Sequence, residues 1–234
     1  RELHMRARVL SESTIRSKGI DGTVAGLIRD LRQRMSTRRA GDSLTRTGMV
    51  AYVAASSLPQ NEVGYTTRTH RLLRALVQQY HASGLQVLAT TRPGFPMDRF
   101  DLEDVELRAT SRVDEIVYHH LDNSQPMQGD LVEFIRIAAA RLADHFASNN
   151  VCLVHAASNY VNAMPAYIAA RALNLPFSYE VRGLWEETTA SKKPRWRSTQ
   201  RFHFERAMET HLIRNADLSF FITRQIQQLF FSKG

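Results

Sequence analysis

The sequence has 234 residues, of which 43% are hydrophobic and 23% are charged, values that are ordinary for a soluble globular protein. This length allows one sizeable core, or one domain with an appendage. No apolar run approaches the roughly 20 residues of a membrane-spanning helix, and no secretory signal pattern follows Arg1. The single cysteine, Cys152, excludes an internal disulfide, as expected for a protein of the reducing cytoplasm.

Positive charge is concentrated at the N-terminal end of the chain. Residues 1–47 hold 11 Lys and Arg against 5 Asp and Glu, whereas the remaining residues hold 20 against 18. Apolar residues within 22–35 recur at helical spacing with arginines between them, which predicts a basic amphipathic helix. We therefore expect residues 1–47 to form a basic, partly helical extension ending in a linker, and residues 48–234 to form the main domain. The extension could attract anionic lipid or nucleic acid, or it could be a solvated helix or partly disordered arm.

From residue 48 onward, strand and helix patterns alternate. Short apolar runs predict strands at 49–54, 85–89, 116–118, 151–154, 177–181 and 218–222. Helical periodicity predicts helices at 65–80, 129–148, 163–173 and 201–214, the third with Pro165 in its first turn. The segment 91–113 is expected to be mostly loop, with room for a short strand at 105–107. This alternation predicts right-handed β-α-β units, and therefore an α/β fold with a Rossmann-like parallel sheet flanked by helices.

Ligands of open parallel sheets bind beyond the C-terminal ends of the strands, so the loops that follow the predicted strands are the candidate site. After the first strand, Gly64 would let a ligand approach free N–H groups at a helix N-terminus, which favour anions; an ordinary turn glycine is the alternative. His155 follows the strand 151–154. It could bond a substrate hydroxyl or transfer a proton, or it could be a packed structural histidine. No glycine-rich dinucleotide or phosphate-loop motif occurs.

The loop after the strand 177–181 carries the densest cluster of polar groups. Strand alternation places Glu180 and Arg182 on one side of the sheet, where an ion pair would fix the guanidinium group. Trp185 offers a flat face for stacking on a sugar or nucleobase, and Glu186 offers an acceptor for hydroxyl groups. A structural salt bridge with a core tryptophan is the alternative interpretation.

A second cationic run follows this loop. Residues 192–197 interleave four cations with Trp196. We expect a surface loop here, which could also touch phosphate or a membrane interface.

Four segments together resemble the N-terminal domain of the retaining, GT-B fold glycosyltransferases of family 4. These segments are Val63–Tyr65, Val154–Asn159, Tyr179–Glu186 and Asn215–Asp217. The most specific is the Glu-x-Arg-Gly-x-Trp-Glu run at 180–186, which follows Ala170–Pro176. Many members of the family carry His-x-His where this chain has His155 and Ala157. The resemblance covers about residue 48 to the end of the chain.

The resemblance implies the acceptor-side half of a GT-B enzyme that transfers a sugar from a nucleotide-sugar to a glycan or lipid-linked acceptor, in polysaccharide or lipopolysaccharide synthesis. In the family, a C-terminal domain with a Glu-x7-Glu signature binds the donor. We expect that domain to lie outside this chain, and the chain alone to be inactive or weakly active. His155 is the implied sugar contact and candidate catalytic residue. The implied substrate-binding residues are Gly64, Tyr65, Arg68, Ser158, Asn159, Glu180, Arg182, Gly183, Trp185 and Glu186.

The family needs no metal ion, so neither a metal nor a cofactor is expected; the nucleotide-sugar is a substrate. We expect a cytoplasmic protein whose basic residues could give peripheral contact with the inner face of the membrane, and no nucleic-acid partner. Two alternatives remain open. One is a GT-B fold sugar-nucleotide epimerase, which would turn over without an acceptor. The other is a non-enzymatic basic docking module held by residues 1–47.

Overall fold

The computed structural model describes residues 19–36, 48–97, 108–121 and 131–231. The strands are β1 (Met49–Ala54), β2 (Gln86–Thr91), β3 (Thr110–Val113), β4 (Ile116–His119), β5 (Val151–Ala157), β6 (Phe177–Val181) and β7 (Leu218–Phe221). The helices are one over residues 19–36, α2 (Gly64–His81), α3 (Leu131–Ser148), α4 (Tyr160–Ala172), α5 (Trp185–Lys192), α6 (Gln200–Asn215) and α7 (Arg224–Phe231), with the 3-10 helix η1 (Pro194–Ser198). No helix of the described residues is long and apolar enough to cross a membrane.

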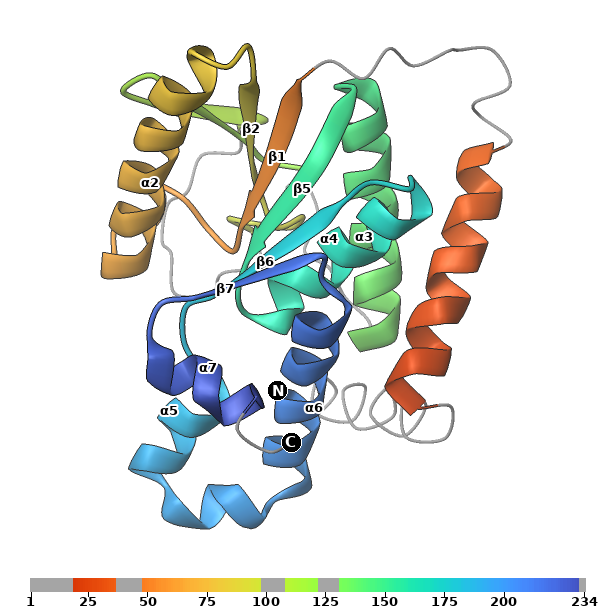
Figure 1. Ribbon diagram of the computed structural model, residues 1–234, viewed down its shortest axis with the longest axis vertical. Coiled ribbons are helices and arrows are strands. Elements are labelled where there is room, and N and C mark those ends of the chain that lie inside the picture. Colours follow the sequence, from red (N-terminus) through yellow and green to blue (C-terminus); the bar gives the residue numbers. More distant parts are fainter. Residues whose placement is uncertain (1–18, 37–47, 98–107, 122–130, 232–234) are drawn as a thin grey trace.

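In the described part of the chain the strands form a seven-stranded sheet in the order β3-β4-β2-β1-β5-β6-β7. All neighbouring strands run parallel except β3 and β4 at one edge, which are antiparallel. The predicted α/β fold with a Rossmann-like, mostly parallel sheet is therefore confirmed. Between β1 and β5 the chain changes direction across the sheet, because β1 continues to β2 on one side and β5 to β6 on the other (Figure 1). Such a switch point opens a crevice beyond the C-terminal ends of the two strands.

The two faces of the sheet are covered unequally. On the face that we call the closed face, the helix 19–36, α3, α4 and α6 enclose one large core cluster with side chains of β1, β5 and β6 (Figure 1). On the opposite face, which we call the open face, α2 covers β1, β2 and β4 over a smaller cluster around Tyr52, Leu73 and Tyr118. Alternation along β1 divides its side chains between the two, since Ala51 and Val53 join the closed face and Tyr52 the open face.

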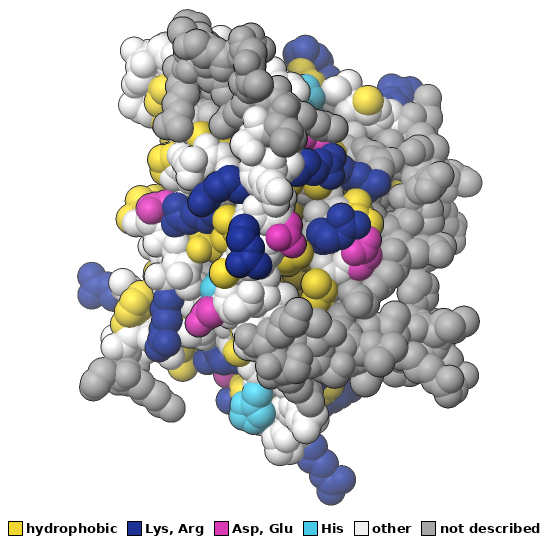
Figure 2. Space-filling model, turned by 90° about the vertical axis from the view of Figure 1, so that its right-hand side faces the viewer, with side chains coloured by type: hydrophobic (Ala, Val, Ile, Leu, Met, Phe, Trp, Pro, Cys, Tyr) yellow, Lys and Arg dark blue, Asp and Glu magenta, His cyan; other side chains and the backbone are white. Residues whose placement is uncertain are grey.

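The predicted basic helix is confirmed, and its apolar stripe is buried. Val24, Leu31 and Met35 belong to the core cluster of the closed face. Arg32 Nη2 donates a hydrogen bond of 2.7 Å to the carbonyl oxygen of Arg171. Figure 2 looks onto the side of the molecule where this helix lies. Lys and Arg side chains lie there beside Asp and Glu side chains. This helix is thus a packed part of the core and has no apolar face free for insertion into lipid. The expected domain boundary near residue 47 lies outside the described residues and stays a prediction.

Several boundaries differ from the prediction for physical reasons. The segment 91–113, expected as loop, contains β3, whose mostly polar residues lack an apolar run but pair with β4 at the sheet edge. Helix α4 begins at Tyr160, so Pro165 lies inside the helix and not in its first turn; burial of most of α4 outweighs the lost hydrogen bond. The strand expected at 105–107 lies outside the described residues.

Three short helical elements were not predicted. α5 and α7 have eight residues each. Only Glu186 and Ala190 are buried in α5, so no apolar stripe marks it in the sequence. In α7, Ile226, Leu229 and Phe230 do recur at helical spacing, a signal that the prediction did not use. η1 occupies part of the run 192–197 that we expected as a loop, and its residues are not buried.

Candidate functional site

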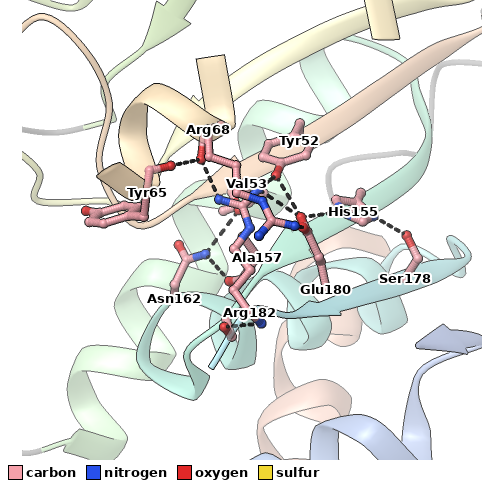
Figure 3. Close-up of polar contacts among 12 residues, drawn as sticks. Tyr52, Val53, Tyr65, Arg68, His155, Ala157, Asn162, Ser178, Glu180 and Arg182 are labelled. Carbon is pink, nitrogen blue, oxygen red and sulfur yellow. Dashed lines mark hydrogen bonds and ion pairs between the residues drawn. The ribbon is translucent and has the colours of Figure 1, made fainter. Parts of the chain in front are cut away.

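The expected pair of Glu180 and Arg182 lies at the C-terminal end of β6, and the ion pair is confirmed. Arg182 Nη2 lies 2.9 Å from Glu180 Oε2. The same guanidinium group donates to Thr69 Oγ1 of α2 at 2.6 Å. It also donates to the hydroxyl of Tyr52 on β1 (Figure 3). Tyr52 in turn donates to Glu180 Oε2 at 3.0 Å. One cation therefore ties β1, β6 and α2 together beside the switch point.

The charges of this network stabilise one another. Burial opposes ionisation of Glu180, but hydrogen bonds and charge from His155 and Arg182 prevail and hold its pKa at about 2. Burial raises the pKa of the Tyr52 hydroxyl above its ordinary value, and the nearby Glu180 charge adds to the rise. At neutral pH the network thus contains a carboxylate, a guanidinium group and a neutral phenol.

The two arginines of the site differ in access. The side chain of Arg182 is only 10% exposed, and its Nε is buried without a hydrogen-bond partner among the described residues. The side chain of Arg68, on α2, is 51% exposed and lies 3.7 Å from Glu180 Oε1. A loosely paired, exposed guanidinium group can take an anionic or hydroxyl-rich ligand without first losing a strong internal contact. Arg68 is therefore suited to contact ligand, and Arg182 to hold the network in place.

The loop between β1 and α2 is braced by the predicted Tyr65 together with Ser56 and Asn61, which the sequence analysis did not single out. The hydroxyl of Tyr65 bonds Ser56 Oγ and accepts from Asn61 Nδ2 at 3.3 Å. Gly64 is the exposed first residue of α2, and a Cβ built there meets nothing within 4 Å. Neither packing nor backbone conformation requires glycine at this position. The observation that fits the predicted approach of a ligand is the open space at the N-terminus of α2.

His155 lies within β5, which is longer than predicted, and not beyond a strand end. Its Nδ1 is 2.8 Å from Ser178 Oγ, and its Nε2 is 3.5 Å from Glu180 Oε2. Its ring packs 4.9 Å from that of Tyr52, measured between centroids. Because both nitrogens face neighbours on β6, His155 supports Glu180 directly. A contact with sugar stays a prediction.

The start of α4 joins the C-terminal ends of β1 and β5. The Nδ2 of the buried Asn162 donates to the carbonyl oxygens of Val53 (3.0 Å) and Ala157 (2.7 Å), and so joins the ends of β1 and β5 (Figure 3). Its Oδ1 is buried and has no partner among the described residues. Ser158 Oγ accepts from the backbone N–H of Arg182 at 3.0 Å, and the carbonyl oxygen of Asn159 accepts from the first turn of α4. Ser158 and Asn159 were predicted as substrate-binding residues, whereas Asn162 was not.

The remaining predicted residues have contrasting environments. Gly183 is followed by α5, whose first residue, Trp185, is 65% exposed, so its ring is accessible and not part of a core. Glu186 is 1% exposed, and its Oε1 accepts from Arg206 Nε at 2.6 Å. The expectation that Glu186 offers a free acceptor is therefore corrected, because its carboxylate is engaged in a buried ion pair.

A groove of about 490 Å³ extends from the polar network along the open face, between α2 and strands β1, β5, β6 and β7. Arg68, His155 and Glu180 line its polar part. Its apolar lining includes Leu72, Leu76, Leu153, Leu218, Phe220 and Ile222. The part of the chain that the structure describes contains no group of three or more His, Cys, Asp or Glu side chains arranged to hold a metal ion.

Fold and site together define an α/β, Rossmann-like protein with a charged crevice at its switch point. The profile of the glycosyl transferase 4-like domain matches residues 63–234, which is most of the chain and includes the whole network except Tyr52. The chain belongs to this family of glycosyltransferase domains.

Among solved structures, one match is a crystal structure described as a UDP-N-acetylglucosamine 2-epimerase from Listeria monocytogenes, with 14% sequence identity and a TM-score of 0.49. The match covers 80% of this chain and 42% of that one, so the chain spans less than half the length of that protein. This likeness is too low to support a conclusion about fold or activity. No curated protein matches the sequence significantly.

Proposed function

We propose that this chain is the acceptor-side domain of a retaining glycosyltransferase that transfers a sugar from a nucleotide-sugar to a glycan or lipid-linked acceptor, in the synthesis of polysaccharide or lipopolysaccharide. The support is the network at the switch point, where Arg182 is fixed by Glu180, Tyr52 and Thr69 beside the exposed Arg68. Such a pre-organised cluster binds hydroxyl and phosphate groups without paying to order its own side chains.

The division of labour within the site follows from access. Arg68 contacts the acceptor or a phosphate group, and Asn162 Oδ1, buried and unpartnered among the described residues, accepts from a ligand hydroxyl. Arg182 and His155 act through Glu180 as positioning residues. The donor is bound mainly by a second domain, and transfer by this chain alone is weak or absent.

The groove favours a lipid-linked acceptor over a purely polar glycan. Its polar end holds Arg68, His155 and Glu180, whereas most of its remaining lining is apolar. An acceptor with a charged or hydroxylated head and a hydrocarbon tail would match both parts, since buried methylene groups contribute about 0.8 kcal/mol each.

The direct test uses the protein encoded by the whole reading frame. Nucleotide-sugars are incubated with and without extracts of lipid-linked and polysaccharide acceptors, and both released nucleotide and labelled product are measured. Transfer predicts nucleotide release that depends on the acceptor, with label in the acceptor fraction. Turnover of the nucleotide-sugar without any acceptor would instead support the epimerase alternative, and absence of turnover with every donor would leave the docking-module alternative.

A further inference from the structure

A basic lobe lies at the lower end of the molecule in Figure 1, near the C-terminal ends of β6 and β7. We define it as α5, η1, the first half of α6 and α7. Arg206 of α6 joins its parts. Its guanidinium group pairs with Glu186 and Glu187 of α5, and it lies over the ring of Phe230 of α7, 5.4 Å from the centroid. The lobe is therefore one connected unit beside the crevice.

The cations of the lobe outnumber its carboxylates, and the carboxylates are already paired. Glu186 and Glu187 bind Arg206, Glu187 also binds Arg197, and Glu205 binds Arg201 at 2.6 Å. Lys192, Lys193 and Arg195 are exposed and form no ion pair within the described residues. These three cations thus present uncompensated positive charge around the turn from α5 into η1.

Large apolar side chains are exposed on the same lobe. Trp185 is 65% exposed, Leu229 50% and Phe231 59%. Tryptophan beside lysine and arginine is typical of segments that lie in a membrane interface, where the indole ring sits at the headgroup level and cations meet anionic lipid. Nucleic acid would use the cations equally, but it gives no reason for exposed Leu and Phe side chains.

We infer that the basic lobe docks on an anionic phospholipid surface, with Lys192, Lys193 and Arg195 against the headgroups and the exposed Trp185 at the interface. This surface differs from the expected basic extension, because the apolar stripe of helix 19–36 is buried. Docking through the lobe brings the crevice close to the bilayer. The inference does not depend on sugar transfer, because lipid binding is measured without donor or acceptor.

The first test is sedimentation with vesicles of phosphatidylcholine alone and of phosphatidylcholine with phosphatidylglycerol at 3:1, in low and high salt. The lobe variant is Lys192→Gln with Lys193→Gln and Arg195→Gln, and the control variant with the same net charge is Arg29→Gln with Arg71→Gln and Arg112→Gln. Each cation near an anionic surface contributes about fivefold in binding, so the lobe variant loses on the order of a hundredfold on anionic vesicles. The control variant loses much less. Equal losses in both variants, or unchanged binding of the lobe variant, would overturn the inference.

The second test measures whether Trp185 enters the membrane interface. Trp185 and Trp196 are the two tryptophans of the chain, so Trp196→Phe leaves Trp185 as the reporter. Its emission shifts to shorter wavelength and is quenched by brominated lipid when anionic vesicles are added, whereas the Trp185→Phe protein, which reports from the half-buried Trp196, changes little. An unshifted Trp185 would contradict interfacial docking. If the lobe variant lost binding to a 30-base-pair DNA duplex but kept vesicle binding, the lobe would be a nucleic-acid surface.

Discussion

The closed and open faces of the sheet use similar strands for different purposes. On the closed face, four helices bury apolar side chains in one cluster. On the open face, α2 covers one half of the sheet, and β5, β6 and β7 present His155, Glu180 and Phe220 to a groove. The strands alternate between the two, so a single β6 supplies Phe177 and Tyr179 to the core and Glu180 to the site. The larger core cluster and the groove thus lie on opposite sides of the sheet.

The largest expected effect contrasts one phenylalanine from each face. Phe146 of α3 is fully buried in the closed-face cluster, whereas Phe220 of β7 is 47% exposed. We expect Phe146→Ala to lower the free energy of unfolding by about 3–5 kcal/mol, because it leaves a cavity that the core fills only partly. Phe220→Ala should cost less than about 1 kcal/mol. Denaturant unfolding measures both values, and similar losses would show that the open face also carries the core.

A buried carboxyl group makes the stability of the closed face depend on pH. Glu209 of α6 is buried; its Oε1 accepts from the backbone N–H of Tyr160 at 2.7 Å, and it bonds the Tyr179 hydroxyl. Burial raises its pKa to about 7, although both hydrogen bonds lower it. The folded state therefore favours the protonated form, which contributes stability below the unfolded pKa of about 4.5 that is lost as pH rises to about 7.

We expect this loss to amount to about 3 kcal/mol between pH 4.5 and 8. Glu209→Gln is neutral at every pH and keeps groups that can bond both partners, so its contribution should not change with pH. Urea unfolding of the two proteins at several pH values measures the difference. A Gln variant with the same pH dependence as the parent would mean that Glu209 is not the responsible group.

A smaller effect distinguishes the two sides of the N-terminal helix. Leu31 is buried in the closed-face cluster, whereas Arg29 is exposed. Leu31→Ala should lower the free energy of unfolding by about 2 kcal/mol, and Arg29→Ala should change it by less than about 0.5 kcal/mol. Equal, negligible effects in thermal unfolding would show that this helix is an appendage and not part of the core.

The sequence predicted the elements whose signal is local. The buried strand β1 appears as a short apolar run, β6 alternates apolar with polar residues, and the Glu180–Arg182 pair follows from that alternation alone. The partners of that pair could not be found in this way, because Thr69 and Tyr52 lie 113 and 130 residues from Arg182 in the chain. Asn162 was missed because its role is to bond two backbone carbonyl groups, for which no residue pattern exists. Glu186 was wrongly predicted to offer a free acceptor. Its burial against Arg206 depends on how α6 packs, and no local sequence pattern shows that packing.

The central claim is that the open-face network positions and contacts the acceptor. The most direct measurement is kcat/KM for the acceptor in the protein encoded by the whole reading frame, compared among Arg68→Ala, Arg182→Lys and the control Arg74→Ala. Arg74 lies on the same helix as Arg68 but pairs with Glu115 at 2.8 Å, away from the groove lining. We expect Arg68→Ala and Arg182→Lys to lower kcat/KM about tenfold to a hundredfold, since each removes a charge-assisted contact, and Arg74→Ala to leave it unchanged. Folded Arg68 and Arg182 variants with unchanged kcat/KM would contradict the claim.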